Sequence, residues 1–163
     1  MSIQEITLTI GNRPGNLQGV AKLLAEWRIN VAAISLSSFK QKSTIKMVVS
    51  DTERALWLLR KAGYKAEATE LLVVRMEDKS GSMLRVLDIL AQHKINVEGA
   101  MILVTREGQK VLIGLDVSTP QRARKRLLDA GFLSSEAKGL ISNSGLVSSN
   151  LIYNATESVG LLL

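Results

Sequence analysis

Two glycines stand where a predicted strand gives way to a helix, and an asparagine follows each of them about one helix length later. The pairs are Gly15 with Asn30 and Gly81 with Asn96. A glycine corner lets the backbone approach a ligand closely, and a helix start exposes amides with positive partial charge that suit a carboxylate. An asparagine amide can donate to a carboxylate and accept from an ammonium group. This pattern predicts a site for an amino-acid-like zwitterion.

The candidate site consists of both corners and both asparagines. The candidate ligand-binding residues are Asn12, Arg13, Pro14, Gly15, Asn16, Leu17 and Asn30 in the first part of the chain, and Asp78, Lys79, Ser80, Gly81, Ser82, Met83 and Asn96 in the second. Simpler interpretations exist, because a glycine is also typical of tight turns and an asparagine of helix ends. The two cations, Arg13 and Lys79, either attract an anion or lie free in solvent.

Residues for catalysis are missing from the sequence. It contains no Ser/His/acid set, no His and acid spacing typical of a metal site, and no phosphate-binding loop. Cysteine is absent, which excludes disulfides and thiolate metal sites. The single histidine, His93, is expected to be partly buried at a helix end. We therefore predict a protein that is not an enzyme and uses no cofactor or metal.

The elements that position these residues repeat along the chain. A shift of 66 residues superposes residues 12–17 on 78–83 and residues 29–31 on 95–97. Alternating apolar residues before each corner predict half-buried strands, and the helical period after each glycine predicts an amphipathic helix. The two apolar stripes are Leu17, Val20, Ala21, Leu24 and Trp27 in the first copy, and Met83, Val86, Leu87, Leu90 and His93 in the second. The repeat predicts two copies of one small unit.

Farther along the chain the shift becomes 68, so that residues 62–64 match 130–132. The two added residues fit a hairpin turn around 106–109, where the first copy has residues 40–43. Asp51 and Thr119 are expected to supply N-cap side chains for a second helix, with Pro120 at its first position. Gly63 and Gly131 are expected to end those helices in the left-handed conformation.

Each copy therefore has the order strand, helix, strand, strand, helix, strand. This order predicts an α+β protein made of two tandem ferredoxin-like βαββαβ sandwiches, each an antiparallel sheet with its helices on one face. The predicted units are residues 1–69 and 70–140, with a short final strand near 65–69 and almost no linker at Glu70. Residues 141–163 fit neither unit, and an edge strand, a partner contact and an artificial extension of the natural protein all stay open for them.

The corner sequence Asn-Arg-Pro-Gly-Asn-Leu, followed by Ile-Asn-Val, resembles the signature of the ACT family. The second copy is similar, although Lys79 and Ser80 replace the Arg-Pro pair. The resemblance covers roughly residues 3–134. It implies a regulatory module that binds small effectors, usually amino acids, in pockets between paired copies.

Composition and charge narrow the choice of partners. The net charge of +6 suggests nucleic acid, but the cations are spread over both copies and the densest run, at 122–126, is typical of a solvated helix face. No apolar stretch reaches the roughly 20 residues of a membrane helix, and no secretory signal begins the chain. We expect a cytoplasmic protein that forms a homodimer through exposed sheet edges. The alternatives are a nucleic-acid-associated regulator and a non-catalytic assembly partner.

Overall fold

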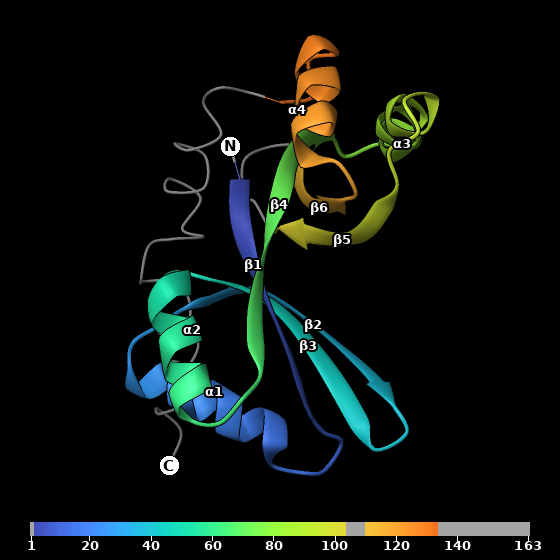
Figure 1. Cartoon of the computed structure of the whole chain (residues 1–163). Coiled ribbons are helices and arrows are strands. Elements are labelled where there is room, and N and C mark those ends of the chain that lie inside the picture. The colour runs from blue at the N-terminus through green and yellow to red at the C-terminus, as the bar shows by residue number, and fades with distance from the viewer. Residues whose placement is uncertain (1, 104–109, 134–163) are drawn as a thin grey trace, which may run out of the picture.

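The computed structural model of the chain describes residues 2–103 and 110–133 (Figure 1). Its elements are β1 (Ser2–Gly11), α1 (Asn16–Glu26), β2 (Val31–Phe39), β3 (Lys42–Val49), α2 (Thr52–Lys61), β4 (Ala66–Glu77), α3 (Ser82–Gln92), β5 (Val97–Leu103), β6 (Lys110–Val117) and α4 (Pro120–Asp129). Strand, helix, strand, strand, helix therefore follow one another from β1 to α2 and again from β4 to α4, as the repeat predicts.

All described strands belong to one antiparallel sheet with the order β2-β3-β1-β4-β6-β5. The first copy contributes β2, β3, β1 and the beginning of β4, which is the strand order of a ferredoxin-like sandwich. The long strands β1 and β4 cross the middle of the molecule, between the helix pair α1 and α2 and the helix pair α3 and α4 (Figure 1). The α+β class with an antiparallel sheet is confirmed.

Strand β4 differs from the expectation of a short final strand near residues 65–69. It is one strand of 12 residues that continues through Glu70. It pairs with β1 as far as Leu72 and with β6 from Leu72 onward. The predicted boundary therefore lies close to a change of pairing partner within a strand, and the two copies share β4.

Each pair of helices covers its own core on the same face of the sheet. The buried residues of the first core are Ile6, Leu8, Ile10, Val20, Leu24, Ile29, Ile45, Met47, Val49, Ala55, Leu58, Leu59 and Ala66. Those of the second are Leu72, Val74, Met76, Val86, Leu90, Ile95, Ile113, Leu115, Val117, Ala123, Leu127 and Leu133. On β4, the even-numbered positions supply both cores, which places all four helices on one face because strand side chains alternate.

The opposite face of the sheet forms a third core that joins the two copies. Its buried residues are Val48, Leu71, Val73, Met101, Leu103 and Leu112. Beside it, Lys46 Nζ lies 3.1 Å from the carboxylate of Glu5, a residue that is only 3% exposed. The ammonium group of Lys46 also lies 3.2 Å from where a Cβ of Gly99 on β5 would be. The sides of the two copies that face away from the helices therefore pack against each other.

The helix ends agree with the sequence in three of four places. Asp51 caps α2 by accepting a 3.0 Å hydrogen bond from the Arg54 amide, and Gly63 and Gly131 have φ of 88° and 76°. Thr119 was expected to cap α4, but its side chain makes no capping hydrogen bond, so that expectation is wrong. Pro120 at the first turn needs no amide partner, which reduces the demand on a cap.

The hairpin expected around residues 106–109 and the unassigned tail 141–163 lie outside the described residues. The corresponding hairpin of the first copy is confirmed, since Phe39 pairs with Lys42 across a turn of two residues. Among the described helices, none has the length and apolar character needed to cross a membrane.

Candidate functional site

The first corner turns on Gly15, immediately before α1. Its φ is 88°, in the left-handed region, and no atom lies within 4 Å of the position where its Cβ would be. The first turn of α1 contains no acidic side chain. No carboxylate of this turn therefore compensates the positive end of the helix, although the Asn16 amide already donates to Arg13 O at 3.3 Å.

Hydrogen bonds fix this corner to the β2–β3 hairpin. The Asn12 amide donates to Gln41 O at 2.8 Å, and its side-chain Nδ2 donates to Lys40 O at 3.1 Å. Asn16 Nδ2 donates to Gly11 O at 2.8 Å. Both asparagine side chains therefore hold the loop in place, while Arg13 and Pro14 are exposed at its tip.

The second corner has the same backbone but different contacts. Gly81 has a φ of 85° with open space around it, and Lys79 forms an ion pair with Glu77. Ser82, at the position of Asn16, is 2% exposed, and its hydroxyl has no hydrogen-bond partner among the described residues. Met83 packs against the second core, whereas its counterpart Leu17 is 38% exposed. Asp78 and Ser80 are exposed.

Both asparagines lie far from the corners of their own copies. The backbone of Asn30 exchanges hydrogen bonds with Ser50, and that of Asn96 with Ser118, each at about 3 Å. These contacts use the backbone, so the asparagine side chain is not needed for them. Since α1 has 11 residues, it separates the Gly15 corner from Asn30 by ~16 Å. One copy therefore does not bring the two halves of the predicted site together.

His93 is the C-cap residue of α3 and is partly buried, as expected. Its amide donates to Leu90 O at 3.2 Å. Among the described residues, no group of three His, Asp or Glu side chains is arranged to hold a metal ion.

A depression of about 710 Å³ lies near the first corner, at the end of β1. Its lining includes Thr9, Gly11, Gln41 and Tyr64. None of the predicted ligand-binding residues is part of that lining. The depression follows the gap where β1 continues beyond its last pairing with β4 at Leu8.

The outer edge of β2 is a surface whose details the sequence did not reveal. The strand carries no charged residue and no proline, and it forms one border of the sheet. Ile34 and Leu36 are 53% and 48% exposed, and Phe39 at the hairpin is 76% exposed. Ile34 and Leu36 pair with the buried Met47 and Ile45 on the helix-covered face, yet they remain exposed at this edge. An uncharged, exposed edge of this kind is prone to pair with another strand.

Two family models match the sequence and together span the described copies. The ACT domain pair matches residues 1–78, and the ACT domain matches residues 71–132. The chain belongs to the ACT-domain family. The resemblance noted in the corner motifs is thereby confirmed, and both matching models describe ACT domains rather than a catalytic domain.

Several solved structures share the fold at low sequence identity. Protein BT0572 from Bacteroides thetaiotaomicron is 18% identical, with a TM-score of 0.74 over 80% of this chain and 90% of that chain. The regulatory subunit of aspartate kinase from Thermus thermophilus is 18% identical, with a TM-score of 0.55 over 79% of this chain and 91% of the subunit. A structure of aspartokinase alpha and beta subunits is 20% identical, with a TM-score of 0.53 over 80% and 93%. No curated protein sequence matches the chain.

Proposed function

We propose that this ACT protein is a regulatory sensor of an amino-acid-like effector, and that two chains complete its site. The observation that carries the proposal is the separation of Gly15 and Asn30 by the length of α1, combined with the unprotected edge of β2. A small zwitterion cannot span both ends of α1. It can be bound by both groups only if a second chain supplies one of them.

Strand β2 suits antiparallel pairing with β2 of a second chain. Its middle residue is Ser35, and pairing about that residue places Ile34 opposite the partner's Leu36. Apolar cross-strand pairs of this type stabilise antiparallel strands, and no like charges oppose each other along the edge. A two-fold axis relates the strands of such a pair, so the assembly closes as a dimer.

The same register brings the separated halves of the site together. Counted along the chain from Ser35, the partner's Asn30 comes level with Lys40 just beyond the strand ends, with its exact position shifted by the β-bulge between Val31 and Ala33. Lys40 O already accepts from the Asn12 side chain, within the corner that contains Gly15. The two-fold axis repeats this arrangement, so the dimer has two such sites.

The chemistry of each site suits both charges of an amino acid. The carboxylate binds the amides at the start of α1, with Arg13 as a nearby cation. The ammonium group is bound by the side-chain oxygen of the partner's Asn30. The ACT family and the fold likeness to a regulatory subunit of aspartate kinase support a regulatory role. Two further expectations stay predictions: that the protein is cytoplasmic, and that its two units are residues 1–69 and 70–140.

A thermal-shift panel with the twenty amino acids tests this function. One or a few of them should stabilise the chain, by ~2.7 kcal/mol at a hundred times the dissociation constant. Sedimentation at the same concentrations should show a dimer. If no amino acid shifts the melting temperature of a folded dimer, the effector assignment is wrong.

A further inference from the structure

A cluster of tryptophans and cations lies on the outer surface of α1 and α2, outside the corners and β2. Trp27 and Trp57 are the two tryptophans of the chain, and they are 42% and 54% exposed. Their ring centres are 6.5 Å apart in an edge-to-face arrangement. Arg54 lies 5.1 Å from the Trp27 ring centre, and Lys61 lies 4.6 Å from that of Trp57.

The repeat indicates that this cluster is not needed for helix packing. The counterparts of Trp27 and Trp57 in the second copy are His93 and Lys125, and α3 and α4 still pack over their core. A unit of this fold therefore forms without the two exposed aromatic rings. Tryptophan and arginine are enriched among the residues that dominate protein interfaces. The cluster thus has the composition of a binding surface.

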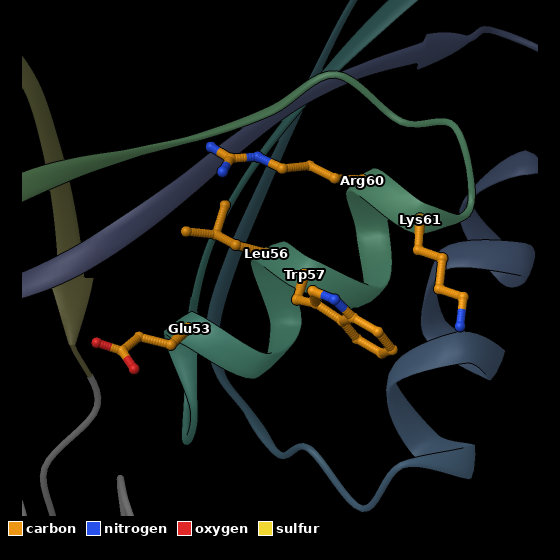
Figure 2. Close-up of a pocket in the computed structure, with 5 residues that line it drawn as sticks. All are labelled: Glu53, Leu56, Trp57, Arg60 and Lys61. Carbon is orange, nitrogen blue, oxygen red and sulfur yellow. The ribbon is translucent and has the colours of Figure 1, made fainter.

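An open depression of about 450 Å³ is lined by residues of α2, including Trp57 (Figure 2). Leu56 and Arg60 extend from one side of α2, and Trp57 and Lys61 extend together from another (Figure 2). Glu53 lies in the first turn of the helix. We call Trp27, Arg54, Leu56, Trp57, Arg60 and Lys61 the tryptophan patch. It combines apolar surface with three cations, and Glu53 is the one acid in the lining of the depression. Its charge suits an acidic partner.

The geometry favours a peptide over a nucleic acid. Stacking of bases requires an accessible ring face, and Arg54 occupies one face of Trp27 and Lys61 one face of Trp57, which reduces the surface for stacking. The carboxylate of Glu53 would also repel a phosphate backbone. A peptide needs only an apolar side chain against Leu56 and the exposed ring edges, with carboxylates beside the cations.

We propose that the tryptophan patch binds an acidic segment of a partner protein that carries an apolar anchor residue. The patch shares no residue with the proposed effector site, but Trp27 lies only three residues before Asn30. This interaction would let the state of a regulatory domain act on another protein.

Selection from a displayed library of random 12-residue peptides tests the proposal. The bait is the full chain, with counter-selection on the double variant Trp27→His, Trp57→Lys, which carries the residues of the second copy. Recovered peptides should combine several Asp or Glu with a Leu, Phe or Trp. A synthetic recovered peptide should change the tryptophan emission, which reports on the patch alone because the chain has no other tryptophan.

Two charge reversals at equivalent positions provide the matched control. Arg54→Glu should weaken peptide binding about tenfold or more, whereas Arg122→Glu in the second copy should leave it unchanged, although both alter the net charge equally. Recovery of no acidic peptides, or equal weakening by the two reversals, would overturn the proposal. Tighter binding of a twelve-nucleotide oligothymidine than of the peptide would also overturn it and favour nucleic acid.

Discussion

The two copies use different residues at equivalent positions on the back of the sheet. In the first copy, Glu5 and Lys46 form an ion pair on the back of the sheet. The equivalent positions in the second copy hold Leu71 and Gly114, and a Cβ on that glycine would lie 2.8 Å from Leu71 Cδ1. The fold thus accepts either an ion pair or a leucine beside a glycine. Where it accepts both, the residue type reflects local packing rather than a requirement of the fold.

The surfaces of the copies differ in a more informative way. Strand β2 has no charge, whereas its counterpart β5 contains Glu98. The first corner is bonded to a hairpin and leaves Arg13 exposed, whereas at the second corner Lys79 is paired with Glu77. The tryptophan patch belongs to the first copy, because His93 and Lys125 replace its two tryptophans in the second. These differences are the reason that we assign most of the proposed binding surfaces to the first copy.

The largest effect is expected at the first corner. Gly15→Val should weaken effector binding by ~100-fold or more, because a side chain would occupy the open space at Gly15, which we propose for the effector carboxylate. The left-handed φ also costs about 1–2 kcal/mol of unfolding free energy for a residue with a Cβ. Gly63→Val is the matched control, with the same φ of 88° and open space, and should lose similar stability but keep its affinity. Calorimetry that found both variants equally impaired, or neither, would place the site elsewhere.

A smaller effect is expected from the ion pair. Lys46→Met leaves the buried Glu5 without its partner and should lower the free energy of unfolding by about 2–3 kcal/mol. This loss is below that of a fully buried pair because the Lys46 side chain is 36% exposed and solvent screens it. Adding Glu5→Leu should recover part of the loss, because it removes the unpaired buried carboxylate, although in the second copy the equivalent leucine lies beside a glycine. Urea denaturation that showed the double variant no more stable than Lys46→Met would contradict this account.

The two sheet edges are expected to differ in self-association. Leu36→Lys should raise the dimer dissociation constant about tenfold or more, because it places a charge within the proposed β2 pairing. Ile102→Lys makes the same change at the equivalent exposed position of β5, where Ile102 is 66% exposed. Sedimentation should show that this second variant remains dimeric. If only Ile102→Lys dissociates the dimer, the chains pair through β5.

The smallest expected effect is a difference in stability between variants of the N-cap residues of α2 and α4. Asp51→Ala should lower the unfolding free energy by ~1 kcal/mol, because the Arg54 amide loses its acceptor. Thr119→Ala should change it by only a few tenths, since the Thr119 side chain makes no capping hydrogen bond. Thermal denaturation of the two variants measures the difference, and equal losses would contradict the assigned caps.

Much of the local structure followed from periodicity and glycine positions. The matching corners, the left-handed Gly63 and Gly131, and the strand and helix order are short-range features that the sequence encodes directly. The sharing of β4 depends on contacts between the copies. A signal was present in residues 71–74, Leu-Leu-Val-Val, because a continuous apolar run is typical of a strand buried on both faces. The burial of Glu5 had no such signal.

The site itself was only half predictable for the same reason. Spacing along the chain related Gly15 to Asn30 but did not show that α1 holds them at opposite ends. Nor did composition show that Asn12 and Asn16 donate to loop carbonyls. Both facts depend on where the chain lies in space. Together they lead to the proposal that two chains supply the two halves of the site.

Mixing two variants tests this central claim most directly. Gly15→Val and Asn30→Ala each remove a different half of the site, so neither dimer should bind effector at a concentration that half-saturates the wild type. After subunits exchange, half of the dimers are mixed, and each mixed dimer has one site with both halves intact. Calorimetry of an equal mixture should therefore recover about a quarter of the wild-type sites at near wild-type affinity. If mixing recovers no binding although sedimentation confirms mixed dimers, the two chains do not share the site.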